Sequence, residues 1–116
     1  MMSRTIYHPQ LAAGGWQKLS FAEQMANIGS EVERAINWRR RGHNQRSQTA
    51  FFRAVELLDL TKEQAKSDSG KLKELCRLKE VLGDYFLGDN IYQSSDDLWQ
   101  KYFRAFTWWA SLQRGK

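Results

Sequence analysis

Cysteine, proline and histidine are scarce in this chain of 116 residues, which contains one cysteine, one proline and two histidines. The single cysteine, Cys76, excludes an internal disulfide, and its place beside leucines at helical spacing predicts a small core residue. Two widely separated histidines and one cysteine give no ligand set with the spacing of a zinc site. We therefore expect no metal and no other cofactor. At this length the chain should fold as one domain without a disulfide or a bound metal ion.

Long apolar runs are also missing from the sequence. No window approaches the ~18 consecutive apolar residues that cross a membrane, and no run of signal-peptide length follows the first residues. We therefore expect no membrane association and a location in a reducing cytoplasm. Period-two alternation with hairpin turns is absent as well, which argues against a β-sheet. Gly14-Gly15 precedes Trp16 and not the Lys-Ser/Thr pair that a phosphate-binding loop needs.

Helical periodicity accounts for most of the chain. Ser20 and Glu23 match a capping box, so a helix should begin there and continue to the arginines before Gly42. Gly29 lies within that helix, where glycine is unfavourable, and we expect it to face a closely packed neighbour.

Three further helices are expected after Gly42. The second should begin near Asn44 or Ser47 and has an apolar face wide enough to be buried on more than one side. The third should begin after Asp68 or Ser69 and end at Gly88. The last should begin at about Ser95.

The sequence therefore predicts an all-α fold, an antiparallel four-helix bundle over residues 19–114. An extended N-terminal arm is expected over residues 1–18, which contain the only proline and show no helical period. We expect this arm to pack through the apolar side chains of Ile6, Tyr7, Leu11 and Trp16. Five carboxylates on polar helix faces are interpreted as surface or capping groups: Glu31, Glu33, Glu56, Asp59 and Asp84.

Aromatic residues cover more than half the circumference of the last helix, and one neighbouring helix cannot bury all of them. Either this helix is central in the bundle or one face meets another copy of the chain. We expect a homo-oligomer, formed through this helix or through the wide second one. The candidate interface residues of the last helix are Trp99, Phe103, Phe106, Trp108 and Trp109.

Charge gives the strongest indication of a partner. Lysine and arginine total 18 against 13 acids, a net charge of +5, which favours an acidic partner such as nucleic acid. The excess is concentrated between Arg34 and Val55, a segment with six arginines and no acid. Arginine binds phosphate in bidentate fashion, and a tryptophan among arginines can stack on a base or on a guanidinium plane. The candidate nucleic-acid contacts are Arg39, Arg40, Arg41 and Arg46, assisted by Arg34, Trp38, His43 and Arg53.

The basic segment is also compatible with three different roles. Arginines in the last turn of a helix complement its dipole, and Trp38 could be a core residue. A protein adaptor with an acidic protein partner would have the same charge. Small helical ribonucleases use an arginine followed, after four to six residues, by a histidine, but Arg39 and His43 are separated by only three. We therefore favour binding of nucleic acid, RNA slightly over DNA, without a catalytic residue.

Three segments, Leu19–Ala35, Arg53–Thr61 and Arg77–Val81, carry a resemblance to known proteins. Over about residues 16–110 the sequence resembles a small prokaryotic family of hypothetical helical proteins. In size, basicity and helical architecture it is also similar to the accessory variability determinant of diversity-generating retroelements, a basic oligomeric bundle that binds RNA and assists a reverse transcriptase. The first resemblance implies a cytoplasmic helical protein, and the second implies an accessory subunit.

Overall fold

The computed structural model describes residues 14–114 as four α-helices and one short 3-10 helix. The elements in chain order are η1 (Gly15–Lys18), α2 (Phe21–Arg40), α3 (Asn44–Gln64), α4 (Ser69–Leu87) and α5 (Asp96–Arg114). No strand occurs among these residues. The predicted all-α four-helix bundle is confirmed.

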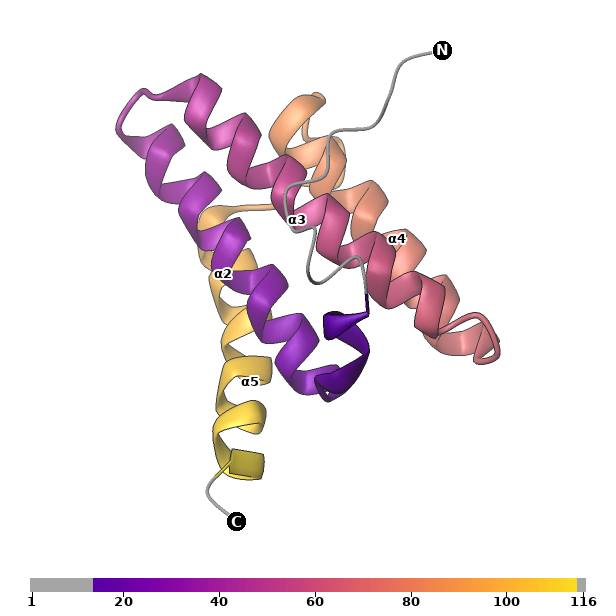
Figure 1. Cartoon of the computed structure of the whole chain (residues 1–116). Coiled ribbons are helices and arrows are strands. Elements are labelled where there is room, and N and C mark those ends of the chain that lie inside the picture. Colours follow the sequence, from indigo (N-terminus) through magenta and orange to yellow (C-terminus); the bar gives the residue numbers. More distant parts are fainter. Residues whose placement is uncertain (1–13, 115–116) are drawn as a thin grey trace.

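The helices α2 and α3 form the central pair of the bundle, and the tight turn between them makes them antiparallel (Figure 1). α5 packs on α2, and α4 packs on α3. α5 also runs antiparallel to α2, because Asp96 at its start contacts Arg40 at the end of α2, while Gln113 near its end contacts Ser20. The start of α5 therefore lies at the α2–α3 turn, which is also the basic end of the molecule.

Helix ends follow the signals in the sequence. The Ser20 hydroxyl accepts a hydrogen bond from the Glu23 N–H at 3.1 Å, and the Glu23 carboxylate accepts from the Ser20 N–H at 3.0 Å, which completes the predicted capping box. Gly42 has a φ of +79° in the α2–α3 turn, as expected of a glycine that ends a helix. Asp68 and Ser95 accept hydrogen bonds from backbone N–H groups in the first turns of α4 and α5.

Trp16 fixes the first described residues onto the bundle. Its side chain is fully buried in the core, and its Nε1 donates to the Thr61 hydroxyl on α3 at 2.9 Å. The Gln24 amide donates to the Trp16 carbonyl at 2.9 Å and to the Gln64 side chain at 2.8 Å, so α2, α3 and η1 are joined by one hydrogen-bond network. The arm residues Ile6, Tyr7 and Leu11 lie outside the described residues.

Close packing of α2 against α5 explains the glycine within α2. A Cβ atom placed on Gly29 would lie 2.6 Å from the Cβ of Phe103, a distance that side chains do not tolerate. The expectation that Gly29 faces a close neighbour is therefore confirmed. The other buried apolar residues of α2 recur at helical spacing: Ala22, Met25, Ile28, Val32, Ala35 and Ile36. The polar Gln24 and Glu31 are buried with them.

Two predictions about the surroundings of single side chains were wrong. Cys76 is exposed, because α4 buries only the narrow face of Leu75, Leu78 and Leu82. The expectation that Glu31 and Glu56 are surface groups also fails, since both are buried. α2 and α3 each pack against more than one element, so their buried faces extend beyond the apolar stripe.

Asp84 has the capping role expected of it, because its carboxylate accepts hydrogen bonds from the Ile91 and Tyr92 N–H groups in the α4–α5 loop. None of the helices in the described part of the chain combines the length and apolarity needed to cross a membrane.

Candidate nucleic-acid interface

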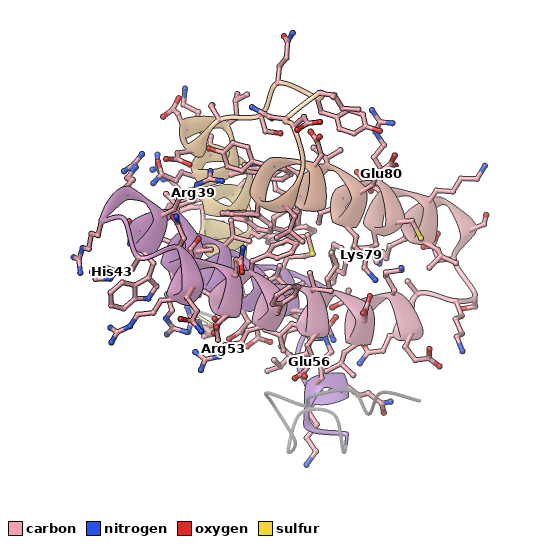
Figure 2. The ribbon with its side chains drawn as sticks, turned by 90° about the horizontal axis from the view of Figure 1, so that it is seen from above. Arg39, His43, Arg53, Glu56, Lys79 and Glu80 are labelled. Atoms are coloured by element: carbon pink, nitrogen blue, oxygen red, sulfur yellow. The ribbon has the colours of Figure 1, made fainter. Side chains whose placement is uncertain are left out.

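The structure divides the predicted basic residues into two groups around the α2–α3 turn. Arg39 and Arg40 face α4 and α5, whereas Arg34, Arg46 and Arg53 lie along the α2–α3 pair. In Figure 2 the labelled Arg39 lies toward α4 and α5, and the labelled Arg53 points away from them. The two groups have different surroundings and therefore different chemical roles.

The first group is centred on Asp96 at the start of α5. Arg40 Nε donates to its Oδ2 at 2.9 Å, and Arg39 Nη2 lies 3.5 Å from its Oδ1. The Tyr85 hydroxyl donates to the same Oδ1. Arg39 also donates to the Tyr85 carbonyl at 3.1 Å, and its guanidinium covers the rings of Tyr85 and Phe86 at 4.3 and 4.7 Å. These contacts join the end of α2 to α4 and α5.

The protonation states of this cluster follow from its geometry. Burial acts to raise the pKa of Asp96, but hydrogen bonds from Tyr85 and Arg40 and the charges of Arg40 and Arg39 hold that pKa below its ordinary value. Burial, together with the hydrogen bond to Asp96, raises the pKa of Tyr85. Tyr85 thus stays a donor and Asp96 an anion, so the carboxylate offsets part of the charge of the two arginines.

The second group lines a hollow between α2 and α3, which we call the Trp38 groove. Its volume is about 450 Å³, and its lining residues are Arg34, Trp38, Gln45, Arg46, Thr49, Ala50 and Arg53. Three of these seven residues are arginines, and none carries a carboxylate. The groove therefore has a positive lining, although Glu31 behind its wall offsets part of the charge of Arg34.

Trp38 organises the mouth of the Trp38 groove. The Arg46 guanidinium lies over its indole ring with the Cζ atom 4.7 Å from the centroid, and that of Arg41 lies at 5.7 Å. The His43 ring meets the indole edge to face at 5.3 Å between centroids. Trp38 is half-buried and stacks on arginine planes, so it orients guanidinium donors at the turn.

Arg34 forms an ion pair at the wall of the groove. Its Nη1 donates to Glu31 Oε1 at 2.6 Å, while more than half of its side chain remains exposed. Glu31 is buried, and its second oxygen has no hydrogen-bond partner among residues 14–114. The pair leaves the remaining donors of Arg34 directed toward solvent, where planar oxyanions such as phosphates bind guanidinium groups.

The sequence pattern identified Arg34, Trp38, Arg46 and Arg53 as candidates, and Gln45 as a possible further phosphate contact, but the polar lining residue Thr49 was missed. A signal existed for Thr49, because positions 46, 49, 50 and 53 are spaced by three or four and share one face of α3. Asp96 was also missed as a partner of Arg39 and Arg40. It lies 56 positions after Arg40, so no local pattern could have shown the contact.

Arg39 and His43, the pair considered for ribonuclease chemistry, have separate surroundings. Arg39 engages Tyr85, Phe86 and Asp96, whereas the His43 ring packs against Trp38. Among residues 14–114, no three histidine, cysteine or carboxylate side chains lie close enough together to hold a metal ion.

The five aromatic candidates for an oligomer interface also divide. Trp99 and Phe103 are buried against α2, and Phe106 is half-buried. Trp108 and Trp109 are 66% and 51% exposed. Only the last two present most of their rings at the surface, and the first two are core residues of the chain itself.

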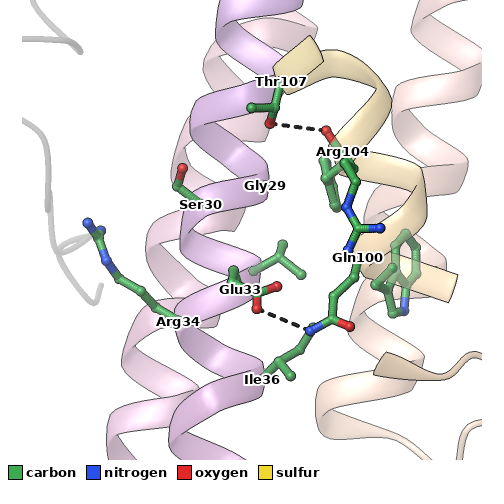
Figure 3. A pocket seen from close by; sticks show the side chains of 11 residues that line it. Gly29, Ser30, Glu33, Arg34, Ile36, Gln100, Arg104 and Thr107 are labelled. Atoms are coloured by element: carbon green, nitrogen blue, oxygen red, sulfur yellow. Dashed lines mark hydrogen bonds between the residues drawn. The ribbon is translucent and has the colours of Figure 1, made fainter. Parts of the chain in front are cut away.

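A second hollow of about 450 Å³ lies between α2 and α5 (Figure 3). Glu33 on α2 accepts a hydrogen bond from the Gln100 amide on α5 at 3.1 Å across it. Its lining residues include Arg34 and Arg104 as well as Glu33, so its charge is mixed. This hollow lacks the uniform positive charge of the Trp38 groove.

Comparison of the chain with protein-family models, with curated proteins and with solved structures returned no match. Its function must therefore be inferred from the chain's own residues.

Proposed function

We propose that the protein binds nucleic acid through the Trp38 groove, by contacts to the phosphate backbone and without chemistry on its ligand. One observation carries the proposal: three arginines from two helices line a single hollow whose lining includes no carboxylate. Guanidinium groups bind phosphates in bidentate geometry, and phosphate contacts provide most of the affinity of non-specific nucleic-acid binding.

The roles of the basic residues differ from those that composition suggests. Arg34, Arg46 and Arg53 supply the main phosphate contacts, and Arg41 extends the cationic surface at the turn. Arg39 and Arg40 act mainly on the fold, because their ion pairs with Asp96 join α2 to α5, whereas the ion pair of Arg34 with Glu31 lies within α2. Trp38 and His43 hold the turn in the binding geometry.

Single-stranded RNA is the ligand we favour over DNA. A groove between two helices can follow one backbone, and aromatic side chains among arginines are typical of proteins that bind single strands. The contacts proposed here are to phosphates and not to base edges, so binding should depend weakly on sequence. In the cell we propose a cytoplasmic accessory subunit of a nucleic-acid-processing complex, such as one with a reverse transcriptase.

A protein adaptor is the second candidate, and the exposed Trp108 and Trp109 on α5 favour it, since aromatic side chains are enriched at protein interfaces. An adaptor would use the basic end to meet an acidic protein. It would show no affinity for nucleic acid beyond that expected from net charge alone.

The test is a fluorescence-anisotropy titration of labelled RNA and DNA strands of mixed sequence. The groove variant replaces Arg34, Arg46 and Arg53 with glutamine. A matched control replaces the exposed Lys18, Lys66 and Lys73 with glutamine, so each variant loses three charges and its net charge falls from +5 to +2.

We expect the groove variant to lose about tenfold or more in affinity and the control about threefold or less. The slope of the logarithm of the binding constant against the logarithm of the salt concentration should also become shallower by about two in the groove variant alone. Equal losses in the two variants would reject the groove as the site. Strands that are shortened during the titration would instead support the ribonuclease alternative.

A further inference from the structure

An apolar stripe runs along the outer face of α5, on the side away from α2. Leu98, Ala105 and Leu112 follow one another at intervals of seven residues, and all three are exposed. Trp109 lies on the same face, and Trp108 lies beside it. The exposed fractions of the four large side chains are 57% for Leu98, 66% for Trp108, 51% for Trp109 and 49% for Leu112.

This stripe is not part of the packing of the chain's own core. The inward face of α5 already buries Trp99, Phe103 and Ala110. Single exposed apolar residues are common, but a contiguous stripe over about four helical turns is typical of an interface. A repeat of seven residues is the period at which one helix packs along another.

We propose that α5 pairs with the α5 of a second copy of the chain, antiparallel about a two-fold axis near Ala105. In this arrangement Leu98 lies opposite Leu112 of the second copy, and Ala105 lies opposite itself. The small Ala105 side chain allows the two helices to approach closely at the centre. Lys101 then lies opposite Trp109 of the second copy, where its stem packs on the indole and its ammonium meets the ring face.

Charge distribution along α5 selects the antiparallel direction. Asp96 and Asp97 occupy its first turn, and Arg114 is its last residue. Asp96 is bound by Arg39 and Arg40 of its own chain, so Asp97 is the acid of the first turn that remains near the stripe. An antiparallel pair keeps the two Asp97 side chains apart and opposes the two helix dipoles. A parallel pair would bring the acidic first turns of both copies together.

The size of the stripe sets the expected strength of the dimer. Aromatic side chains bury about 150–250 Å² each, so the exposed parts of Trp108 and Trp109 offer about 200–300 Å² per copy. With the two leucines, the total over both copies stays below the ~1,200 Å² of stable interfaces and within the range of weak, transient ones. We expect a dimer that dissociates on dilution in the micromolar range.

The dimer goes beyond the proposed function and does not depend on it. Because α5 begins beside the α2–α3 turn, the antiparallel pair places the two Trp38 grooves at opposite ends. One long nucleic-acid strand could then reach both grooves and gain avidity without a new contact. If the Trp38 groove does not bind nucleic acid, the dimer proposal is unaffected.

Sedimentation equilibrium of the full chain over a concentration series tests the association. We expect a monomer–dimer equilibrium whose dissociation constant rises on the order of a hundredfold in Ala105→Glu, because two carboxylates meet at the axis. Ser111→Glu, on a different and exposed side of α5, is the matched control and should leave the constant unchanged. Circular dichroism shows that both variants remain helical. A wild-type chain that is monomeric at every concentration would overturn the proposal. The apolar stripe would then be a surface for a different protein.

Cross-linking with a short bifunctional thiol reagent tests the direction, in a Cys76→Ser background because Cys76 is exposed. Ala105→Cys chains should cross-link with themselves. Leu98→Cys chains should cross-link only when mixed with Leu112→Cys chains. Self-linking of Leu98→Cys alone would show parallel helices and overturn the antiparallel arrangement.

Discussion

The guanidinium of Arg46 lies over the indole of Trp38, with its Cζ atom 4.7 Å from the ring centroid. The two residues belong to different helices, α3 and α2, and the contact spans the turn that contains Gly42. It fixes a long, exposed cation at the mouth of the Trp38 groove. A preorganised guanidinium loses less conformational entropy when it binds a phosphate.

Replacing Trp38 should therefore weaken nucleic-acid binding although the phosphate contacts themselves remain. We expect Trp38→Leu to lower the affinity about threefold to tenfold, since a cation–π contact at an exposed site is worth about 0.5–1 kcal/mol and Arg41 shares the same ring. Trp38→Phe keeps an aromatic face and should retain most of the affinity. Anisotropy titrations measure both. If leucine and phenylalanine have equal effects, the indole does not position the arginines.

Arg39 should matter to stability more than to binding. Arg39→Gln removes a hydrogen bond to the Tyr85 carbonyl and two ring contacts, and we expect the free energy of unfolding to fall by about 1–2 kcal/mol. Arg41 lies two positions along the chain and is exposed, so Arg41→Gln should change that free energy by less than about 0.5 kcal/mol. Urea denaturation monitored by circular dichroism distinguishes the two. Equal stability of both variants would show that Arg39 does not join the helices.

Stability should depend on acid pH through Asp96. Its pKa is lower in the folded chain than the ordinary value of 3.8, so its ionised form stabilises the fold above that value. The contribution is lost as the pH falls through the lower, folded-state pKa. The difference in unfolding free energy between wild type and Asp96→Asn should be constant above about pH 5 and shrink below about pH 4. Denaturation curves over this range measure it, and a difference independent of pH would contradict the ion pairs with Arg39 and Arg40.

Two glycine substitutions should have opposite signs. Gly29→Ala places a methyl group against Phe103, and we expect it to reduce the free energy of unfolding by about 1–3 kcal/mol despite the better helix propensity of alanine. Gly83 lies within α4, and beyond the backbone of its own helix no described residue comes within 4 Å of an added Cβ, so Gly83→Ala should raise stability by about 0.5–1 kcal/mol. Thermal or urea denaturation compares them. Stabilisation by both would show that α5 can move away from α2.

Local chemistry explains why most of the fold was predictable from the sequence. Ser20, Gly42 and Asp68 act within their own turns, so their residue types alone indicated where helices begin and end. The buried stripe of α2 followed from its period for the same reason. The period of α4 wrongly predicted a core position for Cys76, because a period cannot tell how many neighbours a helix has.

The candidate site was predicted only in part. An acid-free run of arginines identified the basic end of the molecule. It did not show which arginines would form ion pairs or hydrogen bonds with more distant segments of the chain. Asp96 and Tyr85 are more than forty residues from Arg39, and only the packing of α4 and α5 brings them to it. The sequence therefore favoured Arg39 and Arg40 over Arg34 and Arg53, whereas the lining of the Trp38 groove includes Arg34 and Arg53 and neither of the other two.

The most direct test of the Trp38 groove is the indole N–H spectrum of the five tryptophans during titration with single-stranded RNA, followed by ¹⁵N-correlated NMR. Binding in the groove predicts that the Trp38 signal shifts early, together with the side-chain signals of Arg34, Arg46 and Arg53. Trp16 is buried and bonded to Thr61, so its signal should stay in place as an internal control. An unchanged Trp38 signal at saturating RNA would contradict the groove as the binding site.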